Sequence, residues 1–174
     1  QSGNALQYLP WLIINTVVGV ELFYARRYEE AIRQYQKTLE MDPNFPIAHL
    51  YLAEAYIQTG RFPDAIAEAE KAVSLAGGAP LFAAELALAH AAAGNRAAAN
   101  RLLKEVCTGA YVPKYGVAMA HIALGDYKQA LAWLEGAVED RSPQLVFLKV
   151  DPKVDRLRSD PRFQDVLRRM NFPP

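Results

Sequence analysis

The sequence predicts an all-α fold, an α-α superhelix of four helical hairpins closed by C-terminal helices. The first observation is an alanine that recurs at a fixed interval, because Ala31, Ala65 and Ala99 are 34 residues apart and Ala130 follows 31 residues later. The second is a set of glycines at the same intervals: Gly60, Gly94 and Gly125. Self-similarity at this period is typical of stacked hairpins, since one hairpin cannot bury its apolar face alone.

The period divides the chain into three parts. Residues 1–9 are expected to be an N-terminal extension or an expression scar, residues 10–142 to form the four hairpins, and residues 143–174 to form capping helices. The four hairpins are expected at residues 10–45, 46–79, 80–110 and 111–142.

Turn and capping residues place two helices in each hairpin. Pro10 suits the first turn of a helix, and a glycine such as Gly60 suits the left-handed residue that ends one. The first helices are expected near 10–24, 46–59, 80–93 and 112–124, and the second near 28–41, 62–75, 95–107 and 127–140. Ser-Pro and Asp-Pro pairs predict three further short helices, near 143–148, 152–157 and 161–170.

The shorter interval before the fourth hairpin should be absorbed at the end of a helix and in the connection that follows it. Removing three residues within a helix would turn its apolar face by about 60°. We therefore expect the loss near Cys107 and in the connection formed by residues 108–113.

Repeated positions have structural explanations. Each first helix has a small residue that lets its partner approach, at Gly19, Ala53, Ala87 and Ala118. An aromatic residue begins most second helices, at Tyr28, Phe62 and Tyr127, and Arg96 replaces it in the third hairpin.

Composition argues against several classes of partner and location. The net charge is zero, so no overall field favours nucleic acid, and none is expected as a partner. The most apolar stretch, Leu9 to Tyr24, is shorter than a membrane span and contains Glu21. The single cysteine, Cys107, forms no intrachain disulfide, which fits a reducing compartment and predicts the cytoplasm.

These residues resemble the tetratricopeptide repeat family. The segment Tyr28-Glu29-Glu30-Ala31-Ile32 is the best match, and the turn motifs Gly60-Arg61-Phe62 and Gly125-Asp126-Tyr127 match too. The tail from Val146 to Phe163 is similar to the end of repeat regions in large bacterial signalling proteins that carry a winged helix, a cyclase or a kinase. The resemblance implies a non-catalytic scaffold in which first helices line a concave groove for a peptide or partner helix.

The groove-side positions of the first helices carry no cation, so a clamp for a terminal carboxylate is not expected. A partner is expected to lie in a largely uncharged groove, because aromatic residues and methionine are favoured at adaptable interfaces. The candidate binding residues are Tyr24, Tyr51, Glu54, Tyr115 and Met119. The spacing of these residues along the first helices also fits positions that are buried between helices. Both interpretations, an exposed groove and an interhelical core, stay open.

No pattern predicts catalysis, a cofactor or a metal. The chain lacks a nucleophile elbow, a phosphate loop and paired-cysteine or HExxH motifs. His90 and His121 occupy equivalent positions in consecutive hairpins, which indicates hairpin packing. The alternative function is self-association, in which Leu9, Trp11, Leu12 and Ile14 near the N-terminal end pair with a second copy.

Overall fold

The computed structural model describes residues 5–171, and within that range every regular element is an α-helix or a short 3-10 helix. The chain forms two compact units, Gln1–Phe82 and Ala83–Pro174. The division falls inside one helix, α5. Part of the expected N-terminal extension, residues 1–4, lies outside the described residues.

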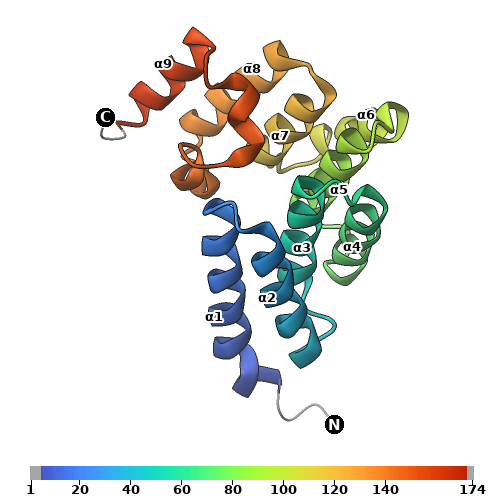
Figure 1. The fold of residues 1–174 in the computed structure, drawn as a ribbon. Helices are drawn as coiled ribbons and strands as arrows, with labels where there is room; N and C mark the ends of the chain where they lie inside the picture. The colour runs from blue at the N-terminus through green and yellow to red at the C-terminus, as the bar shows by residue number, and fades with distance from the viewer. Residues whose placement is uncertain (1–4, 172–174) are drawn as a thin grey trace. The chain divides into compact units, whose positions relative to one another are not determined.

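Unit 1 contains two hairpins (Figure 1). The helices of the first are α1 (Ala5–Tyr24) and α2 (Tyr28–Met41), and those of the second are α3 (Pro46–Gln58) and α4 (Phe62–Leu75). The two helices of each hairpin pack together, and α2 also packs against α3. The second hairpin therefore stacks on the first, as the repeat predicts.

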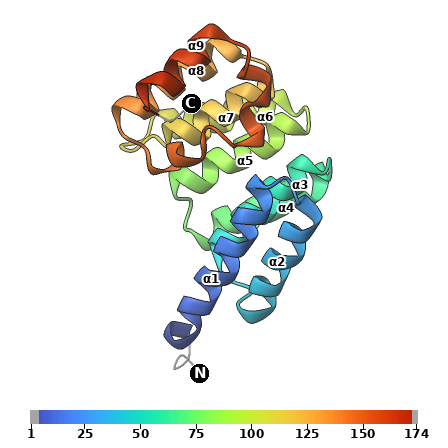
Figure 2. The same cartoon turned by 60° about the vertical axis from the view of Figure 1, so that its left-hand side comes forward.

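Unit 2 contains the remaining hairpins and the C-terminal cap (Figure 2). Its α-helices are α5 (Pro80–Ala92), which begins in unit 1, α6 (Arg96–Cys107), α7 (Lys114–Leu124), α8 (Tyr127–Glu139) and α9 (Pro161–Arg169). Two 3-10 helices, η1 (Pro143–Phe147) and η2 (Pro152–Leu157), lie between α8 and α9. η2 packs on α7 and α9 packs on α8. The cap thus contacts both helices of the fourth hairpin.

The expected helix boundaries are close to the observed ones, with one clear exception. α1 begins at Ala5, so Pro10 lies inside the helix and not in its first turn. The missing N–H of proline costs one backbone hydrogen bond near the start of the helix. The glycine turns agree with expectation, since Gly60 and Gly125 have φ of 74° and 77°.

Close approach of helices depends on the repeated small residues. Ala31, Ala65, Ala99 and Ala130 have no exposed surface. The three-residue loss is taken from the helices, because α6 and α7 have 12 and 11 residues against 14 and 13 in α4 and α5. The early end of α6 at Cys107 agrees with expectation, but the connection formed by residues 108–113 is not shortened, since it is longer than residues 76–79 between α4 and α5. In the part of the chain that the structure describes, no helix is long and apolar enough to cross a membrane.

Candidate functional site

Two of the five candidate binding residues keep part of their surface exposed, and both lie in unit 1. Tyr24, the last residue of α1, packs edge to face against Phe23 with ring centroids 5.3 Å apart. Tyr51, in α3, stacks on Tyr35 of α2 at 5.9 Å with an interplanar angle of 16°. Each ring is held on one side by an aromatic neighbour, which leaves a partly exposed and preorganised surface.

The other three candidate residues are buried. Glu54 and Tyr115 are each 6% exposed, and Met119 is 2% exposed. Because the repeat relates Glu54 to Met119 and both are buried, this position on the first helices faces the protein interior. The structure therefore does not bring the five residues together on one exposed surface.

Tyr115 also has a structural partner in the cap. Its hydroxyl donates a hydrogen bond to the carboxylate of Asp151, which has no exposed surface. The backbone N–H of Lys153 donates to the same carboxylate at 2.8 Å, and the Lys153 ammonium lies 3.5 Å from it. The polar end of Tyr115 thus joins α7 to Asp151, the residue that caps the start of η2.

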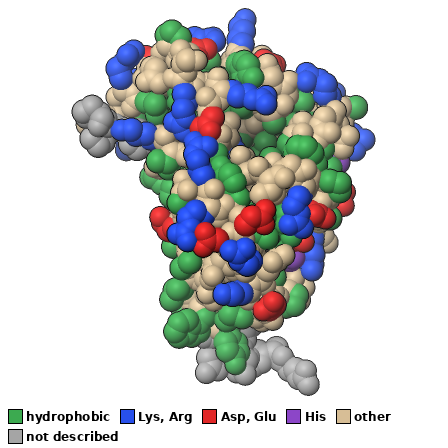
Figure 3. All heavy atoms as spheres, in the orientation of Figure 1, with side chains coloured by type: hydrophobic (Ala, Val, Ile, Leu, Met, Phe, Trp, Pro, Cys, Tyr) green, Lys and Arg blue, Asp and Glu red, His purple; other side chains and the backbone are tan. Residues whose placement is uncertain are grey.

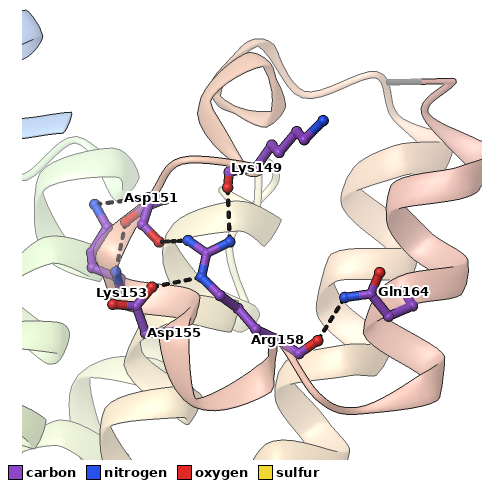
Figure 4. A network of polar contacts seen from close by, with 6 residues as sticks. All are labelled: Lys149, Asp151, Lys153, Asp155, Arg158 and Gln164. Carbon is purple, nitrogen blue, oxygen red and sulfur yellow. Dashed lines mark hydrogen bonds and ion pairs between the residues drawn. The ribbon is translucent and has the colours of Figure 1, made fainter. Parts of the chain in front are cut away.

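Arg158 completes this network (Figure 4). Its guanidinium donates to the carbonyls of Lys149 and Asp151, at 2.8 Å and 3.1 Å, and to the carboxylate of Asp155 at 2.7 Å. The backbone carbonyl of Arg158 accepts from Gln164 of α9 at 2.6 Å. One arginine therefore ties the turn before η2 to η2 and α9.

A second exposed surface lies on α1. Large apolar side chains along this helix are exposed, and Figure 3 shows hydrophobic side chains gathered there. We define the outer face of α1 by Trp11, Ile14, Val17 and Val18, whose exposed fractions are 60%, 52%, 50% and 44%. Leu12, expected at the same surface, is only 2% exposed and belongs to the core. Sequence reasoning missed Val17 and Val18.

The equivalent histidines interact within their own hairpin turns. His90 lies 3.4 Å from the Asn95 amide, and His121 lies 3.8 Å from the Asp126 carboxylate. At the equivalent place in unit 1, Arg61 lies over the ring of Tyr56 at 4.2 Å. The two residues of each pair are five positions apart in the sequence. In these three hairpins, the same position near the end of the first helix therefore contacts the turn that follows it. Among the described residues no group of three or more potential ligands could hold a metal.

His49 has partners that the sequence did not predict. Its Nδ1 lies 2.5 Å from the Glu68 carboxylate of α4, and its Nε2 lies 2.9 Å from the Pro43 carbonyl. The buried ring therefore fixes the turn between α2 and α3 to α4. Cys107 is half-buried, and burial raises the pKa of its thiol, which disfavours the reactive thiolate.

A shallow depression of about 280 Å³ lies at the hairpin turns of unit 1. Its lining residues are Arg26, Arg27, Tyr28, Glu29, Glu30 and Thr59. Arg27 and Glu30 pair with each other at 2.5 Å, and the hydrogen bond from Arg27 lowers the pKa of Glu30. The charges of these two residues are therefore directed at one another.

Family models match two segments of the chain. Residues 19–80 match one described as "Tetratricopeptide repeat", and residues 115–135 match a second with the same description. These segments are tetratricopeptide repeats. Such repeats generally act as non-catalytic scaffolds for protein–protein interaction. No curated protein is similar enough in sequence to count as a relative of this chain.

Solved structures share the fold. A chain in the crystal structure of the APC/C hetero-tetramer Cut9-Hcn1 matches with a TM-score of 0.60 and 21% sequence identity. The match covers 91% of this chain and 32% of that one. At this identity the likeness concerns the fold alone, and it agrees with an all-helical α-α superhelix of tetratricopeptide repeats.

Proposed function

We propose that this chain is a non-catalytic scaffold that binds a peptide or partner helix in a largely uncharged groove, with Tyr24 and Tyr51 as its exposed anchors. The observation that carries the proposal is that these two rings are partly exposed on consecutive first helices and are each held by a neighbouring ring. Tyrosine is favoured at interfaces because it offers a large contact area with few rotatable bonds.

A peptide selection tests this proposal. Peptides would be selected on the full chain from a random phage-displayed library, and their affinities measured for Tyr24→Ala and Tyr51→Ala. We expect each substitution to weaken binding by about tenfold, the loss typical of an interface anchor. Tyr111→Ala is the matched control, because Tyr111 is 60% exposed in a connection of unit 2.

Thermal unfolding of each variant separates binding from folding. Weaker binding by a variant that melts like the wild type supports the groove. Peptides that bind both tyrosine variants as well as the wild type, or that lose affinity only with Tyr111→Ala, would reject it.

The cellular setting proposed for this scaffold is the cytoplasm, as part of a larger bacterial signalling protein. The support is the likeness of the tail, residues 146–163, to the ends of repeat regions in such proteins, together with the single cysteine. The gene around this segment tests the assignment. A winged helix, cyclase or kinase encoded in the same reading frame would support it, and an unrelated catalytic domain would contradict it.

A second candidate function is self-association. It is favoured by the outer face of α1, where large apolar side chains are exposed next to one another. Contiguous apolar surface of this kind marks interaction sites in folded proteins. The oligomeric state of the chain in solution tests it.

A further inference from the structure

We propose that His49 and Glu68 form a proton-controlled latch between α3 and α4 of unit 1. The latch is closed while a proton lies between the imidazole ring and the carboxylate, and it opens when that proton is lost to solvent. The inference concerns the packing of the second hairpin, so it holds or fails independently of the peptide groove and of self-association.

Both nitrogens of the His49 ring face oxygen atoms. Nδ1 lies 2.5 Å from the carboxylate of Glu68, and Nε2 lies 2.9 Å from the backbone carbonyl of Pro43. A carbonyl oxygen only accepts hydrogen bonds, so Nε2 donates its proton to Pro43. A neutral ring has a single N–H, which would leave the lone pair of Nδ1 directed at the carboxylate. The contact with Glu68 therefore requires a second proton between Nδ1 and the carboxylate.

Burial makes this second proton necessary for the contact. The side chain of His49 is 3% exposed, whereas that of Glu68 is 26% exposed. Without the proton, a buried lone pair and a carboxylate face each other with little water between them, which is unfavourable. Because Glu68 reaches the surface, its carboxylate can turn to solvent while Nε2 keeps its bond to Pro43. The proton thus controls the connection of His49 to α4 and not the one to the turn before α3.

The repeat contains the same interhelical contact in a form that needs no added proton. Asn15 and Gln34 stand one period before His49 and Glu68, and the Gln34 amide donates to the side-chain oxygen of Asn15 at 2.8 Å. Both pairs join the first helix of a hairpin to its second helix. An amide pair carries its own donor and acceptor, so its hydrogen bond does not depend on a titrating group. The second hairpin therefore has a titratable pair where the first has a neutral one.

Glu68 is the charged group that faces the His49 ring. α3 packs against α1, α2 and α4, whose other charged side chains are exposed, apart from Glu30, which forms an ion pair at 2.5 Å with the residue that precedes α2. In the connection before α3, the carboxylate of Asp42 accepts from a backbone N–H of the same turn at 2.9 Å. Glu54 lies five residues beyond His49 on α3 and therefore on a different side of the helix.

The latch makes the stability of unit 1 fall as the pH rises. An unfolded histidine releases its proton near pH 6.5, whereas the closed latch retains one. Above that pH the folded chain binds more protons than the unfolded chain, so the free energy of unfolding decreases with increasing pH. One retained proton raises the unfolding equilibrium constant by up to about tenfold per pH unit. The effect ends at the pH where the folded chain also loses the proton.

Nitrogen NMR of the histidine rings in the full chain tests the proton directly. The His49 signals would be assigned by their loss in His49→Asn. We expect the His49 ring to carry protons on both nitrogens at pH 7, where a free histidine is largely neutral. A neutral His49 ring at pH 7 overturns the latch, and this result does not depend on the folding of any variant.

Urea unfolding between pH 6.5 and 8.5 tests the consequence for stability. The amide introduced by Glu68→Gln can donate to Nδ1 of a neutral ring, so the contact survives without the second proton. We therefore expect Glu68→Gln to remove the pH-dependent rise of the unfolding constant that the wild type shows. Burial lowers the pKa of His121, so that residue titrates below this range.

Two further variants make the comparison specific. Glu70→Gln removes the same charge from an exposed position of α4 and should keep the wild-type pH dependence. The double variant His49→Asn with Glu68→Gln introduces the neutral pair of the first hairpin and should lose it. A wild type without this pH dependence, or a Glu68→Gln variant that retains it, overturns the proposal. Its loss in Glu70→Gln as well would overturn the assignment to Glu68, since any acid of α4 would then suffice.

Discussion

At the scale of single residues, Gly19 and Tyr35 form a matched pair. The other first helices have alanine where α1 has Gly19, and their second helices have Ala69, Leu103 and Leu134 where α2 has Tyr35. A Cβ on Gly19 would lie 2.7 Å from Cδ1 of the Tyr35 ring and closer still to Cε1. The glycine is therefore required by the ring beneath it and not by the backbone.

We expect Gly19→Ala to destabilise unit 1. Overpacking a filled core costs about 1–3 kcal/mol, while alanine in a helix contributes about 1 kcal/mol in the opposite direction. In a Tyr35→Leu background the clash disappears, so Gly19→Ala should become stabilising. Urea unfolding of the four proteins in a double-mutant cycle measures the change. The same sign of effect in both backgrounds would contradict the pairing.

His121 makes the stability of unit 2 depend on pH. Burial lowers its pKa below the usual 6.5, and the carboxylate of Asp126 acts in the opposite direction more weakly. Between the lowered pKa and 6.5 the unfolded chain binds more protons than the folded one, so the free energy of unfolding falls on acidification through this window. We expect His121→Gln to reduce that loss when urea unfolding is compared above and below pH 6.5. An unchanged pH dependence would show that His121 contributes nothing.

At the scale of helices, small residues on the second helices control how closely the hairpins pack. Ala65 of α4 has no exposed surface, whereas Ala67 on the same helix is exposed. We expect Ala65→Leu to lower the free energy of unfolding by about 1–3 kcal/mol through overpacking. Ala67→Leu is the matched control and should change it by less than about 0.5 kcal/mol. Equal effects of the two substitutions in thermal or urea unfolding would refute the close contact at Ala65.

At the scale of the molecule, the period of 34 residues predicts the fold well, because it records where helices must approach and turn. Ala31 and Ala65 are buried and Gly60 has a positive φ, as expected. The site is harder to predict, since the period relates equivalent positions without showing which side of a helix meets a neighbour. Of the four equivalent positions, Val20, Leu88 and Met119 are apolar and Glu54 is not, which was the available sign that this position is buried.

The C-terminal cap has short helices where the sequence predicts them, and it also contains a contact that the sequence does not encode locally. Ser142-Pro143 and Asp151-Pro152 predict helix starts, and the structure has 3-10 helices there. The carboxylate of Asp151 accepts a capping hydrogen bond from the backbone N–H of Lys153. It also accepts a hydrogen bond from the hydroxyl of Tyr115, which is 36 residues away in sequence. Such a long-range bond has no signature in the spacing of either residue.

This bond predicts how the cap stabilises the chain. Tyr115→Phe removes one donor from a buried carboxylate, and we expect a loss of about 1.5–3 kcal/mol, the usual contribution of a hydrogen bond to a charged group. Because units in a repeat array interact mainly with their neighbours, hydrogen exchange should accelerate in α7, η2 and α9 and stay unchanged in α1 and α2. Tyr111→Phe, at an exposed tyrosine of unit 2, is the control. Uniform acceleration from α1 to α9 would show instead that the whole chain opens as one cooperative unit.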